Sequence, residues 1–377
     1  MGADNSNPVN NTQAKSLDHE KKKACVNCGA ELKYKPGSTN LTCQYCGHQE
    51  VIETDSGFIE LELQPYLNEM GAQKHSEEIS MLKCKTCGAT QHIEENYKSL
   101  HCVYCSMPLI IEDAYKEDWI LPGAVLPFQM NHNKSRAIFQ KWVRGLWFAP
   151  NNLKKAALDP ERTKGLYLPY WTFDAQLFAN YTGERGTHYY KNQQYNAVVD
   201  GRNVVKTRQV RNTRWAPANG AIKGFIDDTL IRAFKPRNPR IPIGISQWNL
   251  EKLQPFNSKF LAGFVTEKYT IPLSKGHIES NKEAKKIAQH WIRRDIGGDE
   301  QRIHQMQMKL EEETFKHILL PVYVSSFKYK GKAYNFFVNG ESGSIHGNRP
   351  YSAWKIFFAI LAGLALILFF AMMSGGM

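Results

Sequence analysis

The pattern of hydrophobic and polar positions divides the chain into a polar start, a long punctuated middle and an apolar end. Residues 1–24 contain no apolar period, so they predict a disordered tail. In the middle, short apolar runs rich in aromatic residues alternate with Gly and Pro from about residue 112 to 350. Two segments there have apolar residues at helical spacing, 133–148 and 280–296. The second opens with a capping box, Ser280-x-x-Glu283, and ends at a Gly-Gly pair.

Strand patterns fill the rest of this middle region. About 20 to 25 residues beyond each predicted helix comes a related apolar strand, Leu168-Pro169-Tyr170-Trp171 and then Leu320-Pro321-Val322-Tyr323. A hairpin with an Asp-Gly turn is predicted within 198–205. We therefore expect 112–350 to be an aromatic-rich α+β domain in which a helix-then-sheet unit is used twice.

The apolar end predicts a single transmembrane helix over 354–373. Ile356 to Met373 are 18 residues without a charge or a proline. At about 1.5 Å per residue they span about 27 Å, close to the ~30 Å of a hydrocarbon core. A buried core helix is the alternative, but the segment has no polar face. Arg349 and Lys355 precede it and no Lys or Arg follows, which predicts a single-pass protein of the cell membrane with cytosolic N-terminal domains.

A duplicated cysteine module lies between the tail and the α+β domain. The pattern Cys-x2-Cys-x14-Cys-x2-Cys occurs twice, and the second copy is displaced by 59 positions. We name the copies ribbon 1 (25–50) and ribbon 2 (84–111), with a connector over 51–83. Together they use all eight cysteines of the chain: Cys25, Cys28, Cys43, Cys46, Cys84, Cys87, Cys102 and Cys105.

Four thiolates delivered by two tight turns suit a tetrahedral metal site. Each Cys-x2-Cys pair forms one turn, called a knuckle below, and two knuckles supply four soft ligands. Four protein ligands leave no open position, so we predict two structural Zn²⁺ ions and small β-sheet ribbons around them. Disulfides, redox-active thiol pairs and rubredoxin-like iron are the alternatives. The absence of an apolar run in 1–24 argues against secretion and therefore against disulfides.

Charge adds a candidate surface for an anionic partner. Lys and Arg number 48 against 36 Asp and Glu, an excess of 12. Basic residues concentrate after residue 201 and include Arg202, Lys206, Arg208, Arg211 and Arg214. Such a stripe fits nucleic-acid phosphates, acidic lipid headgroups or a solvated sheet face.

The motifs that usually signal an enzyme do not occur. The one Gly-Lys pair, Gly331-Lys332, is followed by Ala333, so there is no phosphate-binding loop. No His-Glu-x-x-His, Gly-x-Ser-x-Gly or Gly-x-Gly-x-x-Gly occurs either. We predict a protein that is not an enzyme, and in particular not a helicase.

Taken together, these features resemble the bacterial membrane-anchored TFIIB-type twin zinc-ribbon proteins of the YdjG-like kind, which are often labelled primosomal or helicase-like. Besides the ribbons and the terminal helix, the resemblance rests on Trp147-Phe148-Ala149-Pro150, Leu168-Pro169-Tyr170-Trp171-Thr172-Phe173-Asp174-Ala175, Gly183-x-Arg185-Gly186, Leu319-Leu320-Pro321, Val338-Asn339-Gly340-x-Ser342-Gly343 and Pro350-Tyr351-Ser352. It implies zinc binding, one membrane anchor and association with membrane-stress scaffolds of the phage-shock and SPFH type. It brings no catalytic residue.

Two functional hypotheses follow. The first is a non-catalytic, membrane-tethered adaptor whose zinc ribbons recruit protein partners to the cytosolic face, where tethering raises the local concentration of whatever is bound. The second is a membrane-associated nucleic-acid-binding protein without motor activity. It would act through the ribbons and the basic stripe, and its binding would weaken steeply with salt.

Overall fold

The computed structural model describes residues 24–54, 57–58, 60–68, 76–92, 100–105, 107–109, 115–151, 163–199, 202–235, 247–329, 332–347 and 350–374. Residues 1–23 of the predicted tail and the segment 236–246 lie outside these residues. The helices are α1 (Leu63–Leu67), α2 (His132–Arg144), α4 (Leu273–Ile296) and α5 (Ala353–Ser374), with 3₁₀ turns η5 (Leu250–Lys252) and η6 (Ser258–Leu261).

The strands range from two-residue pairs to one of 37 residues. In chain order they are β1 (Leu32–Tyr34), β2 (Asn40–Cys43), β3 (Gln49–Val51), β4 (Leu61–Glu62), β5 (Ser76–Lys83), β6 (Thr90–His92), β7 (Leu100–His101), β8 (Pro108–Leu109), β9 (Tyr115–Ile120), β10 (Ala124–Val125), β11 (Thr163–Val199), β12 (Arg202–Arg232), β13 (Gln254–Pro255), β14 (Val265–Thr266), β15 (Glu300–Tyr329), β16 (Lys332–Asn339) and β17 (Ile345–Gly347).

Three long antiparallel strands, β12, β11 and β15, form the frame of the body. β11 pairs with β12 from Tyr170 to Val199, and with β15 from Thr163 to Gly186. The two related apolar strands predicted from the sequence therefore lie side by side, with Leu168 opposite Leu320. The short strands β10, β14 and β16 pair with β11 or β15 near the base of this sheet.

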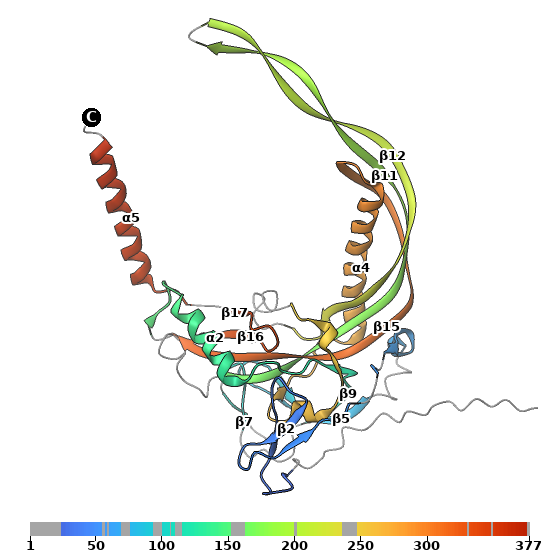
Figure 1. Cartoon of the computed structure of the whole chain (residues 1–377), viewed down its shortest axis with the longest axis vertical. Coiled ribbons are helices and arrows are strands. Elements are labelled where there is room, and N and C mark those ends of the chain that lie inside the picture. The colour runs from blue at the N-terminus through green and yellow to red at the C-terminus, as the bar shows by residue number, and fades with distance from the viewer. Residues whose placement is uncertain are drawn as a thin grey trace, which may run out of the picture.

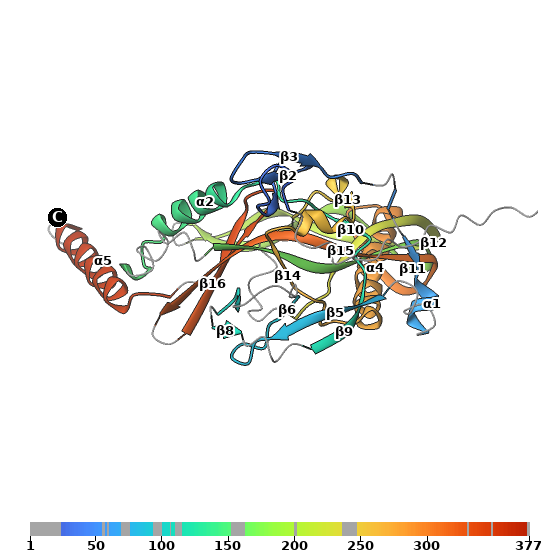
Figure 2. The ribbon, with the colours of Figure 1, turned by 90° about the horizontal axis from the view of Figure 1, so that it is seen from below.

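The base of the sheet is buried on both faces, and one ribbon covers each face. Successive residues of a strand point to opposite faces. Leu166 and Leu168 pack in a core cluster with Cys84 and Cys102 of ribbon 2, whereas Tyr167 between them packs in a cluster with cysteines of ribbon 1. Figure 2 shows the two sets of ribbon strands on either side of the long strands. This arrangement explains why the apolar runs here are continuous rather than alternating.

Two β-bulges at one level bend the three long strands. The register of β11 against β12 shifts between Phe173 and Ala175, and its register against β15 shifts between Asp174 and Gln176. Asp228 and Glu312, on the two neighbouring strands, adopt positive φ angles of 46° and 52°. Because a bulge adds a residue to one strand, it increases the local bend and twist. Beyond this level the strands curve around α4 (Figure 1).

Helix α4 is longer than predicted. The sequence placed its start at Ser280, which is wrong: the helix begins at Leu273, after Pro272, and Ser280 is buried in its interior. Small residues continue the buried stripe back through Gly276, where an added Cβ would lie 2.8 Å from the Trp171 ring. The helix ends where predicted, because Gly297 takes the positive φ of 64° that favours glycine.

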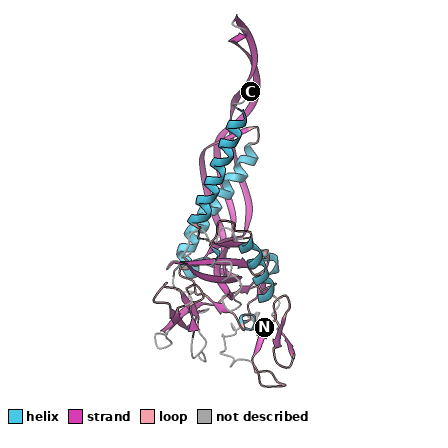
Figure 3. Ribbon diagram, turned by 90° about the vertical axis from the view of Figure 1, so that its left-hand side faces the viewer, coloured by secondary structure: helices cyan, strands magenta, loops and turns pink. Residues whose placement is uncertain are grey.

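Beyond Gly186, β11 and β12 continue without β15 as a pair of antiparallel strands. We call this segment, residues 187–199 and 202–214, the arm. Figures 1 and 3 show the arm and α5 rising from the same side of the body, with the cysteine ribbons at the opposite side. The molecule therefore has two ends: one carries the cysteines, and the other carries the apolar helix and the arm.

A buried histidine in β15 makes the body sensitive to acid. His317 lies among Trp119, Trp171 and Tyr269, and its Nδ1 donates to the carbonyl oxygen of Ile120 at 2.7 Å. Burial lowers the pKa of His317 to about 3, although that hydrogen bond acts in the opposite direction. Because the folded pKa is depressed, the unfolded chain binds the proton first. His317 therefore stabilises the fold above about pH 6.5, and this stability is lost as the pH falls towards 3.

The expected result is a loss of up to about 1.4 kcal/mol of unfolding free energy per pH unit in that window. Chemical denaturation at a series of pH values measures it. A His317→Phe variant should show a shallower slope, by about one proton. Equal slopes for the two proteins would show that His317 does not titrate on unfolding.

Candidate metal centres

Ribbon 1 brings its four cysteines to one point through two knuckles. The backbone N–H of Gly29 donates to the carbonyl oxygen of Cys25 at 2.8 Å, and that of Gly47 donates to Cys43 at 3.1 Å. Both glycines have positive φ angles, 74° and 76°, which other residues rarely adopt. The strands β1, β2 and β3 carry the second knuckle back to the first.

Ribbon 2 repeats this geometry. Gly88 N donates to the carbonyl oxygen of Cys84 at 2.6 Å, with a φ of 70° at the glycine. In its second knuckle, Cys102 N donates to the carbonyl oxygen of Met107 at 2.9 Å. Strands β5 and β9 flank this ribbon and pair with each other, with Ser76 opposite Ile120 and Met81 opposite Tyr115. Paired structure therefore begins inside 51–83, the segment predicted to be a connector.

The sulfur atoms in each quartet are spaced for a shared metal ion. Within each quartet the ligand atoms all lie within 4.8 Å of one another. The shorter separations are 3.4 and 3.5 Å in ribbon 1, and 3.6 and 3.4 Å in ribbon 2. A tetrahedral centre with bonds of about 2.3 Å places its sulfurs about 3.8 Å apart, whereas a disulfide needs about 2.05 Å. No disulfide bond joins any of the eight cysteines, all of which lie within the described residues. The two quartets can therefore each hold one metal ion, and the donor set is compatible with zinc.

The backbone of the second knuckle of ribbon 1 also favours the thiolate form of Cys43, which is the form that binds metal. The backbone N–H groups of Cys46 and Tyr45 point at the sulfur of Cys43 and lower the pKa of its thiol to about 6, against the opposing effect of burial. In ribbon 2 the neighbouring Cys87 sulfur and burial raise the pKa of Cys102. Crowded thiolates repel one another, and a bound cation removes that repulsion.

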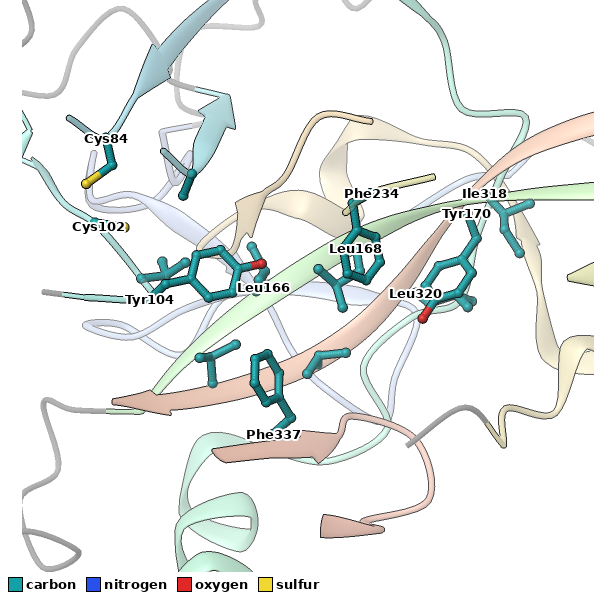
Figure 4. Close-up of a cluster of buried hydrophobic side chains, with 14 of the residues drawn as sticks. Cys84, Cys102, Tyr104, Leu166, Leu168, Tyr170, Phe234, Ile318, Leu320 and Phe337 are labelled. Carbon is teal, nitrogen blue, oxygen red and sulfur yellow. The ribbon is translucent and has the colours of Figure 1, made fainter. Parts of the chain in front are cut away.

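The two ribbons dock on the body through different surfaces. Ribbon 1 uses its hairpin: Tyr34 N donates to Ala262 O at 3.1 Å, and Gly37 N donates to Phe128 O at 2.8 Å. Ribbon 2 uses the knuckle itself. Its Tyr104 is 6% exposed, packs against Phe337 at a ring distance of 6.4 Å, and donates its hydroxyl to Glu267. Figure 4 shows this side chain reaching from the ribbon towards Leu166 and Phe337 of the body.

The duplication makes this difference informative. Tyr45 occupies the position in ribbon 1 that Tyr104 occupies in ribbon 2, 59 residues later. Tyr45 is 86% exposed, and Val26 in the other knuckle of ribbon 1 is 78% exposed. The same knuckle thus forms an internal contact in ribbon 2 and an open apolar surface in ribbon 1.

Removing one hydroxyl from each copy should separate the two roles. We expect Tyr104→Phe to lower the unfolding free energy by about 1.5–3 kcal/mol, because a buried hydrogen bond to a carboxylate is lost. The matched change Tyr45→Phe should stay within about 0.5 kcal/mol of wild type, since that side chain faces solvent. Urea denaturation of both variants measures the difference. Equal losses would contradict the docking of ribbon 2 through Tyr104.

The predicted basic residues lie far from the cysteines. Arg202, Lys206, Arg208, Arg211 and Arg214 are all exposed, and all lie on the β12 strand of the arm. The structure brings them together with one another but not with either quartet, which lies at the other side of the body (Figure 1).

Sequence reasoning missed a charge cluster at the bulge, built around the buried side chains of Asp174 and Lys316. Asp174, Asp227 and Asp228 converge there. The ammonium of Lys316 contacts Asp228 and Glu60 at 2.9 Å and Asp174 at 3.5 Å, so a lysine already provides the positive charge. Burial opposes the charge on Lys316, but the carboxylates of Asp228 and Glu60 outweigh it and raise its pKa. The cluster is part of the bend in the sheet rather than a third metal centre.

A comparison with known proteins shows a relative that is similar over most of the chain. No family model matches the chain, and no solved structure matches it. The chain is similar to the uncharacterized protein YdjG of Bacillus subtilis (strain 168). The two are 25% identical over 363 residues, which cover 93% of this chain and 98% of that protein. The similarity therefore extends well beyond the cysteine modules. Because that relative is itself uncharacterized, it assigns no activity.

Proposed function

We propose that this protein is a non-catalytic, membrane-tethered adaptor, in which ribbon 1 recruits a protein partner to the cytosolic membrane face. The observation that carries the proposal is the open knuckle of ribbon 1 beside its buried copy in ribbon 2. In the internal copy, an apolar surface and a carboxylate cover the tyrosine. A partner surface with the same chemistry, an acidic residue beside aromatic or aliphatic side chains, would cover Tyr45.

The two ribbons are proposed to be TFIIB-type zinc ribbons with structural Zn²⁺. Zinc suits four thiolates at these separations and supplies no open coordination position. Its contribution would be to hold the knuckles rigid, so that Val26 and Tyr45 present a fixed surface. Rigid surfaces lose little conformational entropy on binding, which favours recognition of a partner.

Helix α5 is proposed to be the membrane anchor. It is long and apolar enough to cross a bilayer, with 21 residues from Ala353 to Met373 and none of its apolar window buried against the body. Aromatic residues gather where it begins: Trp147 and Trp354 are 81% and 72% exposed. The Lys355 ammonium ties this base to the body by donating to Ala149 O at 2.8 Å, and Ser352 N donates to Phe148 O at 2.8 Å. Tryptophans at the end of an apolar helix are typical of a membrane interface.

Orientation and partners are further parts of the proposal. The cations at the start of α5, Arg349 and Lys355, favour a cytosolic location for the ribbons and the body. Reduced, metal-binding thiols agree with that compartment. Membrane-stress scaffolds of the phage-shock or SPFH type are the candidate protein partners. A nucleic-acid-binding role is the alternative, because the arm carries a cluster of cations.

Affinity capture from detergent-solubilised membranes tests the adaptor role. The full-length protein is compared with Val26→Ser/Tyr45→Ser, in which the open knuckle loses its apolar surface. Ile278→Ser is the control, because Ile278 is an apolar residue exposed on α4. We expect a protein that co-purifies with wild type and with the control to be lost from the knuckle variant, while all three retain two metal ions. Recovery of the same proteins from all three would contradict recruitment through ribbon 1.

A further inference from the structure

The arm separates its charges by face. In an antiparallel pair, residues that lie opposite each other point to the same side. Lys206 lies opposite Tyr195, Arg208 opposite Gln193, and Asn212 opposite Tyr189. By this alternation one face carries five of the six cations of the arm strands, Lys191, Arg202, Lys206, Arg208 and Arg214. The other face carries Arg211 alone, among Asn, Gln, Thr, Tyr, Val and His residues.

Tyrosines on the cationic face hold the basic side chains in place. The Arg208 guanidinium lies 5.4 Å from the centre of the Tyr195 ring. Arg214 and Lys191 lie 5.4 and 5.6 Å from the centre of the Tyr189 ring. Neither strand of the arm contains Asp or Glu; Asp200, between the strands, is the one carboxylate in 187–214. The cations are therefore not neutralised by acidic residues within the arm itself.

The cationic face continues the face of the sheet that α4 covers. Nearer the body, Leu177, Ala179 and Tyr181 pack against α4, and no register shift separates them from the arm in the β11–β12 pairing. Helix α4 is itself cationic, with six Lys and Arg against three Asp and Glu. Helix α4, which lies on the inside of the curve in Figure 1, and the arm thus bring many cations to continuous parts of the molecule.

We propose that this cationic face of the arm binds the anionic phospholipid headgroups of the membrane that takes up α5. The inference rests on the proposed anchor. The arm and α5 rise from the same side of the body (Figures 1 and 3), so a bilayer that holds α5 lies on the side of the arm. The arm's strand edges carry unpaired backbone groups, and its cations are hydrated, so it cannot enter hydrocarbon. Figures 1 and 3 show the arm running in the same general direction as α5 and past its end, so contact with the headgroup layer, where basic residues and tyrosines are both favoured, requires the arm to be inclined to α5 in the membrane.

One apolar residue near the tip of the arm lies on the cationic face. Val204 is 38% exposed and lies opposite Ala197, between Arg202 and Lys206 along that face. A short apolar side chain beside cations suits the boundary between headgroups and acyl chains. Val198 and Val205 are more exposed, at 71% and 65%, but they lie on the opposite face and do not contribute to this contact.

Hydrogen exchange of the full-length protein in lipid nanodiscs tests the proposal. One sample uses phosphatidylcholine discs, a second uses discs that also contain phosphatidylglycerol, and a third adds a short DNA duplex to the phosphatidylcholine discs. We expect amides of 187–214 to exchange more slowly on the anionic discs than on the neutral ones, and this difference to be lost in high salt. The DNA duplex should leave the arm unprotected.

Matched variants assign the effect to the arm. Lys206→Gln/Arg208→Gln should lose the protection on anionic discs. Lys35→Gln/Lys83→Gln removes the same charge from two exposed positions, one in ribbon 1 and one at the end of the connector, and should retain the protection. Unchanged exchange in α4 confirms that both variants are folded.

Protection of the arm by DNA and not by anionic discs would overturn the proposal, and so would equal exchange on both disc types. Free exchange of 354–373 in every sample would instead reject the membrane anchor, so the two failures are distinguishable.

Discussion

Cys102→Ser is expected to remove one of two bound metal ions and to destabilise the whole body. Three thiolates and a hydroxyl hold zinc far less tightly than four thiolates, and structural zinc contributes about 10–16 kcal/mol to small metal-dependent folds. This contribution is comparable to the whole unfolding free energy of an ordinary domain, about 5–15 kcal/mol. Cys102 belongs to a buried cluster with Leu168, Leu320 and Phe337, so its ribbon cannot unfold alone.

Cys28→Ser provides the comparison within ribbon 1. Cys28 is exposed, but Cys25 and Cys43 of the same ribbon pack in a buried cluster with Phe128, Tyr167 and Tyr323 of the body. This variant should also bind a single ion, and it should destabilise the face of the sheet that ribbon 1 covers. Native mass spectrometry counts the ions, and circular dichroism follows thermal unfolding. Two ions in either variant, or S–S bonds in the wild type, would show that the quartets are not the metal sites.

The second large effect is expected at Lys316. We expect Lys316→Ala to lower the unfolding free energy by about 3–5 kcal/mol at neutral pH, because Asp174, which is 3% exposed, is left without its cation. Lys309→Ala is the control: its side chain is 74% exposed and pairs with Glu311, so the change should cost less than about 0.5 kcal/mol.

The pH dependence of the Lys316→Ala variant gives a second readout. Burial raises the pKa of Asp174, although the Asp228 N–H and Lys316 act in the opposite direction. Without the lysine this carboxyl becomes still harder to ionise. A group whose folded pKa is raised favours the fold at low pH, where it is protonated, and loses that contribution as the pH rises through its folded pKa. The deficit of the variant should therefore shrink as the solution is acidified, which chemical denaturation at several pH values measures. A deficit that grows in acid would contradict this account.

The metal centres could be predicted from the sequence because their determinants are local. A Cys-x2-Cys turn closes within a few residues, and the constant displacement of 59 positions shows two copies of one unit. The C-terminal helix could be predicted equally well, because its length and composition alone define it. In both cases the chemistry is contained in one short segment.

The different docking of the two ribbons could not be predicted in the same way. Tyr45 and Tyr104 occur in the same motif, and what separates them is Glu267 and Phe337, which lie more than 150 residues away in the chain. Those residues reach Tyr104 because the body sheet folds between them. No pattern around the cysteines records this contact.

The arm and the bend were predicted only in part. The Asp-Gly signal located the end of the hairpin, and the structure pairs Val199 with Arg202 on either side of it. The strands nevertheless run for 37 and 31 residues, because β15 and α4 support their lower halves. The bulge at Asp174 depends on Lys316 in another strand, so its acidic residues had no local signature.

Site-specific photo-crosslinking tests the central claim most directly. Full-length protein carries a benzophenone amino acid in place of Tyr45, or in place of Ile278 as the exposed control, and is irradiated in intact membranes. The account predicts a discrete covalent adduct with another protein from position 45, its loss when Cys28→Ser is added, and no such adduct from position 278. An unreactive position 45, or the same adduct from both positions, would contradict the assignment of ribbon 1 as the surface that holds a partner at the membrane.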